Sequence, residues 1–81
     1  MRVVVRLFAA AREALGREEL HLELPAGSTV REVREAVSCL APEARPLLEQ
    51  CLLARNREFA SPEEALQEGD EIAFLPPVGG G

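Results

Sequence analysis

The chain contains no lysine, tryptophan or tyrosine, and all nine of its basic residues are arginines. A domain without lysine offers no side-chain amine to which the carboxyl end of another protein can be joined. Its fourteen acidic residues outnumber the arginines and give a formal net charge of −5 at pH 7. Because nucleic-acid binding depends on clustered cations, this balance argues against a nucleic-acid partner and favours a basic protein partner.

Histidine and cysteine are also scarce: His21 is the only histidine, and Cys39 and Cys51 are the only cysteines. This set is too small for a structural zinc or an iron–sulphur cluster, and it contains no Cys–His or Ser–His–Asp arrangement for nucleophilic catalysis. We therefore expect no metal site and no enzymatic activity from side chains. The cysteines are expected to be small buried residues in a reducing compartment, and His21 is expected to be exposed.

Long apolar runs are missing as well. No segment approaches the ~20 apolar residues that cross a bilayer, and the N-terminal segment carries an arginine inside its apolar run, which is not typical of a secretory signal. We expect a cytoplasmic protein without a membrane partner. A chain of 81 residues forms one domain and buries only about 60% of its unfolded surface, so a deep internal active site is not expected.

The first half of the chain shows the apolar patterns of two strands and two helices in turn. Residues 2–8 predict a strand with Val3, Val5 and Leu7 on one face. Residues 9–15 predict a short helix that ends at Gly16, and residues 18–24 predict a second alternating strand. After the break at Pro25, Thr29 and Glu32 fit a capping box that opens a helix. Its apolar stripe is formed by Val30, Val33, Ala36, Val37 and Leu40, and its solvent face by Arg31, Glu32, Arg34 and Glu35.

The second half predicts mainly strands. Residues 48–55 are apolar enough for a buried strand, and Asn56-Arg57 form a turn into a short strand through Phe59. Ser61-Pro62-Glu63-Glu64 is typical of a helix start, and Glu71–Leu75 is the last strand. This order predicts an α+β fold of the β-grasp (ubiquitin-like) class, a mixed sheet of about five strands with one main helix on one face. The predicted domain spans residues 1–75, followed by a flexible Gly-Gly tail at 76–81.

The tail is the one motif that carries chemistry. Pro76 and Pro77 cannot extend the sheet, so the chain must leave the domain there. Val78 and the three glycines after it, Gly79, Gly80 and Gly81, span at most about 14 Å. Residues without a Cβ can thread a channel too narrow for side chains and leave the terminal carboxylate open to adenylation. Taken alone, a Gly-rich end is equally typical of a frayed terminus, but here it directly follows the last strand of a β-grasp pattern.

Three segments of the chain resemble one known family. They are Gly69-Asp70-Glu71-Ile72-Ala73-Phe74-Leu75-Pro76-Pro77-Val78 with the terminal Gly80-Gly81, the opening Val5-Arg6-Leu7-Phe8-Ala9-Ala10-Ala11-Arg12-Glu13, and Ala54-Arg55-Asn56. Together they are similar to the small, sulphur-carrying subunits of molybdopterin synthase. Gly79 departs from the family, in which a β-branched or hydroxyl residue is frequent.

The resemblance implies a cycle in which Gly81 is the reacting residue. A ubiquitin-activating-type adenylyltransferase uses ATP to adenylate its carboxylate, and a sulphur donor converts it to a thiocarboxylate. The tail then enters the large catalytic subunit, in a heterotetramer, and gives its sulphur to cyclic pyranopterin monophosphate in molybdenum cofactor biosynthesis. The chain itself would bind no permanent cofactor and would not be an enzyme alone.

A docking surface is expected on the sheet face away from the helix. Strand parity places Val4 and Phe8 on the first strand and Ala73 and Leu75 on the last, and these strands are adjacent and parallel in a β-grasp sheet. Phe59 falls where the family places an apolar contact. Phe8, Phe59, Leu75, Pro76 and Pro77 are therefore the expected partner-binding residues.

Two other classes of function stay open at this point. The chain could be another β-grasp sulphur carrier, serving thiazole synthesis, tRNA thiolation or ubiquitin-like protein tagging. It could also be a plain interaction domain whose tail has no chemistry.

Overall fold

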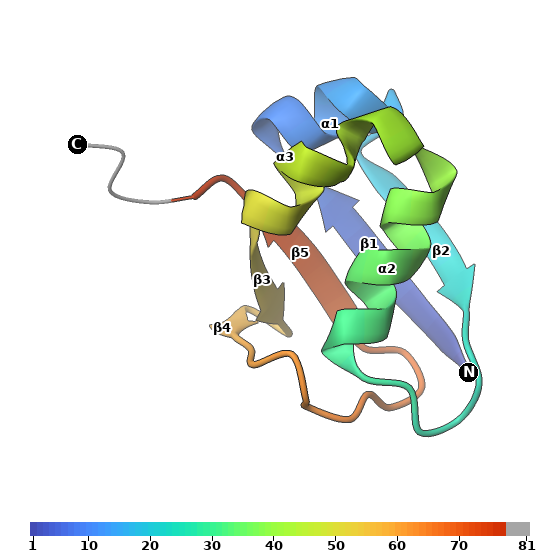
Figure 1. The fold of residues 1–81 in the computed structure, drawn as a ribbon. Helices are drawn as coiled ribbons and strands as arrows, with labels where there is room; N and C mark the ends of the chain where they lie inside the picture. The colour runs from blue at the N-terminus through green and yellow to red at the C-terminus, as the bar shows by residue number, and fades with distance from the viewer. Residues whose placement is uncertain (78–81) are drawn as a thin grey trace.

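The computed structural model describes residues 1–77 and builds them around one mixed five-stranded sheet (Figure 1). The elements follow in the order β1 (Arg2–Leu7), α1 (Ala9–Leu15), β2 (Glu19–Glu23), α2 (Val30–Leu40), a 3₁₀ turn (Pro42–Ala44), α3 (Arg45–Gln50), β3 (Leu52–Arg55), β4 (Glu58–Phe59) and β5 (Glu71–Leu75). The strands lie in the order β2-β1-β5-β3-β4. The predicted β-grasp class is confirmed.

The two central strands run parallel, and the other pairs are antiparallel. Leu7 of β1 is paired with Phe74 of β5, so both strands end at the same side of the sheet. All the helices cover one face of the sheet, and the other face is open (Figure 1).

The core lies between the helices and the covered face. The predicted inward residues Val3, Val5 and Leu7 are at most 1% exposed, because alternate residues of a strand share one face. They pack in one apolar cluster with residues of β5, α2 and α3, among them Ile72, Phe74, Val30, Val33, Val37 and Leu48.

Two helix ends form as the sequence predicts. Gly16 follows α1 with a φ of 73°, and its N–H donates to the Arg12 carbonyl at 2.8 Å. At the start of α2, the Glu32 carboxylate accepts a hydrogen bond of 3.0 Å from the Thr29 N–H. Both motifs depend on residues at most four positions apart, which is why the sequence alone predicts them.

The predicted helix start at Ser61–Glu64 is wrong. These residues form a turn in which the Glu64 N–H donates to the Ser61 carbonyl at 3.2 Å. The carbonyls of Pro62 and Glu64 instead accept hydrogen bonds from the N–H groups of Arg31 and Val30, each at 3.0 Å. The first N–H groups of a helix have no partner inside it, so this segment caps α2 and cannot coil into a helix of its own.

The predicted strand at 48–55 is half wrong. Its first residues belong to α3, in which Leu48 is fully buried, and the strand begins only at Leu52. Pro46 at the start of α3 favours the helix, because its missing N–H is not needed there.

Three residues near α2 also differ from expectation. Leu40 was assigned to the apolar stripe but is 60% exposed, and Cys39 is exposed while Cys51 is buried as expected. Leu40 is the last residue of α2, beyond the part that packs on the core. Arg34 was expected in solvent but is partly buried, and its guanidinium donates to the carbonyls of Leu48 and Cys51 at the end of α3.

Candidate functional site

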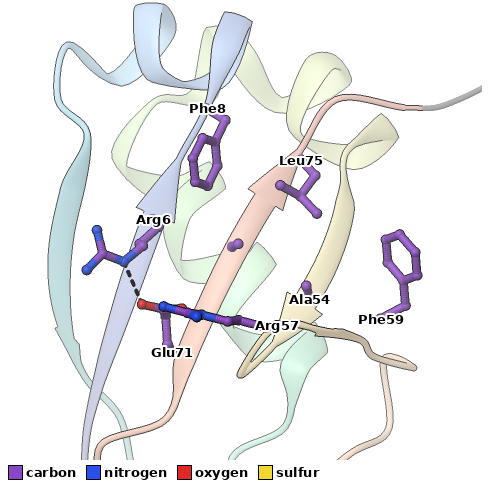
Figure 2. Close-up of a pocket in the computed structure, with 8 residues that line it drawn as sticks. Arg6, Phe8, Ala54, Arg57, Phe59, Glu71 and Leu75 are labelled. Carbon is purple, nitrogen blue, oxygen red and sulfur yellow. Dashed lines mark hydrogen bonds and ion pairs between the residues drawn. The ribbon is translucent and has the colours of Figure 1, made fainter.

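The open sheet face carries a shallow cavity near the ends of β1 and β5. The cavity measures about 530 Å³, and Figure 2 shows the side chains around it. It is lined by Arg6, Phe8, Ala54, Arg57, Phe59, Glu71, Ala73 and Leu75. The surface formed by these eight residues is called the open-face surface below.

Strand register explains why these residues meet. Ala73 of β5 is paired with Arg6 of β1 on one side and with Ala54 of β3 on the other, and Ala54 is paired with Phe59 of β4. Paired residues point to the same face of a sheet. The two alanines are small and form the floor, so the larger residues at the edges enclose a hollow.

The apolar part of the surface lies toward the C-terminal end of β5. Phe8 follows the last residue of β1 in an extended conformation and is 42% exposed, and Phe59 is 72% exposed. Leu75, which is half-buried, lies between these two rings in Figure 2. Exposed aromatic rings in a concave surface are typical of protein contacts. Pro76 and Pro77, both exposed, follow directly.

The polar part is a row of charges across the same face. Arg6 forms an ion pair with Glu71 through its Nε and another with Glu19 of β2 at 3.4 Å. The hydrogen bond that Arg6 donates to Glu71 and the negative charges of both carboxylates raise the pKa of Arg6. Arg57 extends from the β3–β4 turn over the sheet toward Glu71 (Figure 2).

A network of polar side chains fixes the loops at the edge of this surface. The buried carboxylate of Asp70 accepts hydrogen bonds from the Arg55 Nε at 2.8 Å, the Asn56 Nδ2 at 3.0 Å and the Gln67 N–H at 2.8 Å. Burial alone would raise the pKa of Asp70, but these donors together lower it below its ordinary value. Asp70 therefore stays ionised and ties the β3–β4 turn to the start of β5.

The predicted site residues divide into two groups. Phe8 and Leu75 line one cavity, on the face that parity indicated, and Phe59, which was predicted from the family resemblance, lines it too. Val4 is half-buried on the same face but does not line the cavity. The tail residues Val78, Gly79, Gly80 and Gly81 lie outside the described residues. That any of these residues contacts a partner stays a prediction.

Sequence reasoning missed the charged half of the surface. Arg6 and Glu71 are neighbours only because β1 and β5 are parallel, and parity would have placed both on the open face. Arg57 lies in the turn between β3 and β4, where the alternation of residues along a strand gives no indication of its direction.

Within residues 1–77, no three His, Cys, Asp or Glu side chains come together in a way that could hold a metal ion. Burial raises the pKa of the Cys51 thiol, which keeps it protonated and unreactive. His21 is exposed, as predicted, and its ring contacts the Glu19 carboxylate at 3.0 Å. No helix in the described part of the chain is long and apolar enough to span a membrane.

Comparison with known proteins gives one consistent result. A model of the ThiS family matches residues 5–81. The molybdopterin synthase sulfur carrier subunit of Chlamydomonas reinhardtii is 34% identical over 83 aligned positions, which cover 100% of both chains. The small archaeal modifier protein 1 of Haloferax volcanii is 32% identical, and the alignment covers 94% of this chain and 97% of that protein.

Two solved structures have a similar fold. A putative molybdopterin converting factor subunit 1 from Pyrococcus furiosus superimposes with a TM-score of 0.87 at 28% identity, over 96% of this chain and 99% of that one. A chain from the complex of subunits 1 and 2 of the molybdopterin-converting factor of Helicobacter pylori gives a TM-score of 0.70 at 28% identity, with 100% of both chains covered.

Proposed function

This chain belongs to the ThiS family, and we propose that it is the sulphur carrier subunit of molybdopterin synthase. The observation that carries the proposal is the full-length similarity to carrier subunits of that enzyme. The open-face surface supports this proposal. Leu75 lies at the root of the tail, so the apolar end of the cavity can hold a partner while the tail reaches into that partner.

The reacting group is the Gly81 carboxylate. A ubiquitin-activating-type adenylyltransferase joins it to AMP and releases pyrophosphate from ATP. A sulphur donor then displaces AMP, so that one carboxyl oxygen is replaced by sulphur. The thiocarboxylate is a stronger nucleophile than the carboxylate, which is why the carrier is activated before transfer. No side chain of the chain takes part in these steps.

The large catalytic subunit is the acceptor of the tail. In the Helicobacter pylori complex, a similar chain is bound to subunit 2, which supports a partner of this kind. Phe8, Phe59 and Leu75 anchor the partner, Pro76 and Pro77 direct the chain away from the sheet, and Val78, Gly79 and Gly80 thread toward its active site. There the sulphur passes to cyclic pyranopterin monophosphate, in a heterotetramer in the cytoplasm.

One relative favours a second function, since the similar Haloferax volcanii protein is a modifier protein. A tag of this kind forms an amide with an amine on its target. Because the chain has no lysine, it cannot build lysine-linked chains of itself, although its carboxyl end could still join another protein. A denaturing gel after incubation with activating enzyme and ATP, without a sulphur source, separates these outcomes by adduct size.

Two variants of the tail test the carrier function. The chain is incubated with activating enzyme, ATP and a sulphur donor, and intact mass is expected to show the exchange of one oxygen for sulphur. Adding the large subunit and the pterin precursor should then yield molybdopterin. Deleting Gly81, or adding one residue after it, should abolish both signals and leave the melting temperature unchanged. Full synthesis by the extended chain would refute this mechanism.

A further inference from the structure

The turn between β3 and β4 has an unusual residue at its second position. Asn56 and Arg57 form a two-residue loop with φ angles of 50° and 74°, the geometry of a type I′ turn, in which Asn-Gly is the favoured sequence. For an L-residue with a side chain, a positive φ brings Cβ against the carbonyl oxygen. Arg57 therefore occupies a position where glycine would fit with less strain.

The surrounding structure holds the turn in this shape. The Asn56 Nδ2 donates to Asp70, its Oδ1 accepts from the Glu71 N–H at 3.0 Å, and its own N–H donates to the Glu71 carbonyl at 2.8 Å. On the far side of the turn, the Ala60 N–H donates to the Leu53 carbonyl at 3.0 Å. Because the turn is fixed from both sides, the direction in which the Arg57 side chain leaves the backbone is fixed as well.

The two arginines of the open-face surface differ in their contacts. Arg6 forms ion pairs with Glu71 and Glu19. Arg57 lines the same cavity but forms no ion pair among residues 1–77. Of the two arginines that line this cavity, Arg57 is therefore the one whose guanidinium is not held by a carboxylate among residues 1–77.

Strained residues gather at this surface. The described residues other than glycine that have a positive φ are Ala9, Asn56 and Arg57. Ala9 directly follows Phe8, and Arg57 precedes Phe59 by two residues, so the strain flanks both exposed rings. Strain that persists in a folded protein is concentrated at functional sites.

We propose that Arg57 is a specificity-determining residue that binds a carboxylate of the large subunit, beside the apolar contacts of Phe8, Phe59 and Leu75. The inference rests on the proposed function. A planar guanidinium forms two parallel hydrogen bonds with a carboxylate, so it fixes the orientation of an acidic side chain of the partner. The predicted partner surface therefore pairs an apolar projection for the cavity with an Asp or Glu at its rim.

The test exchanges Arg57 for the residue that the turn prefers. Arg57→Gly relieves the strained φ and removes the cation, so Tm is expected to stay equal or rise while Kd for the large subunit increases about tenfold. The dependence of Kd on salt should also weaken. Arg57→Lys keeps the charge but not the planar guanidinium, so its Kd should lie between those of the unmodified chain and Arg57→Gly. The matched control is Arg17→Gly, an exposed arginine beside β2, which makes the same change of charge without affecting binding.

The outcomes separate the inference from the proposed function. If the unmodified chain does not bind the large subunit at all, the proposed function and the inference both fail. If it binds and Arg57→Gly binds equally well with the same salt dependence, only the inference is overturned. If Arg57→Gly lowers Tm as well as the affinity for the large subunit, Arg57 has a structural role, and the inference is again overturned. Arg57→Asn, a residue that tolerates positive φ, repeats the test if the glycine variant does not fold.

Discussion

Asn56 donates its side-chain amide to Asp70 at 3.0 Å and accepts a hydrogen bond from the N–H of the next residue, Glu71. One side chain thus joins the β3–β4 turn to the beginning of β5, and the turn carries Arg57 and leads to Phe59. The shape of the open-face surface depends on this link, because β4 has only two residues and cannot hold its place by strand pairing alone.

The first prediction concerns this link. Asn56→Ala removes two hydrogen bonds and places alanine at a φ of 50°, so we expect it to lower the free energy of unfolding by about 2–3 kcal/mol. Asn56→Gly loses the same bonds but tolerates the φ angle, and it should cost only about 1–2 kcal/mol. Chemical denaturation measures both. Equal stability of the two variants would show that strain at this position is negligible.

A second prediction concerns acid. Hydrogen bonds lower the pKa of Asp70 in the folded protein, so its contribution to stability is present above the unfolded pKa of about 3.9 and is lost as pH falls through the folded pKa. We expect unfolding free energy measured from pH 6 down to pH 2 to drop in that acid range. Asp70→Asn, which cannot titrate, should be less stable at pH 6 and should show a shallower acid slope. An unchanged slope would contradict the role given to Asp70.

A third prediction uses two buried serines with opposite surroundings. Ser38 in α2 is 1% exposed, and its hydroxyl has no hydrogen-bond partner among the described residues. Ser28 is 3% exposed, and its hydroxyl donates to the Pro25 carbonyl at 2.8 Å. Removing an unsatisfied buried group stabilises a fold, whereas removing a satisfied one costs about 1 kcal/mol.

Thermal unfolding of the two alanine variants checks this contrast. Ser38→Ala should raise Tm, and Ser28→Ala should lower it, by about 4 °C in each case for a domain of this size. A fall of Tm in both would indicate that the Ser38 hydroxyl is satisfied after all.

The sequence predicts those features of the fold that depend on near neighbours. The Thr29–Glu32 capping box and the Gly16 helix end form as expected, because each is decided within one turn of helix. The segment at 61–64 carries the same kind of local signal, but its carbonyls are taken by Val30 and Arg31, more than thirty residues away. No local pattern reveals that competition.

In the candidate site, too, the sequence predicts what local patterns decide and misses what depends on distant contacts. Strand parity was enough to bring Phe8 and Leu75 to one face, since it needs only the period of the strand and the parallel pairing of β1 with β5. Arg57 was missed because its direction depends on two positive φ angles and on the link from Asn56 to Asp70. Short apolar runs are ambiguous for a third reason: the run around Leu48 fits a buried helix as well as a buried strand.

The last prediction compares the effect of a charge in the core with the effect of the same charge on the open-face surface. Val5 is fully buried under the helices, so Val5→Asp places an unpaired charge in the core and should unfold the domain, at a cost above about 4 kcal/mol. Phe8 is 42% exposed on the open face, so Phe8→Asp should cost less than about 1 kcal/mol yet weaken binding to the large subunit at least tenfold.

Leu40 provides the matched control for that binding measurement. It is a large apolar residue with 60% of its surface exposed, but it ends α2 on the covered side of the sheet. Leu40→Asp introduces the same charge and removes a similar exposed area, so neither stability nor Kd should change appreciably. Calorimetric titration of the two variants expected to fold, Phe8→Asp and Leu40→Asp, decides between the faces. If Leu40→Asp weakened binding as much as Phe8→Asp, the partner would dock on the helical side, because the change of net charge is identical and only its position differs.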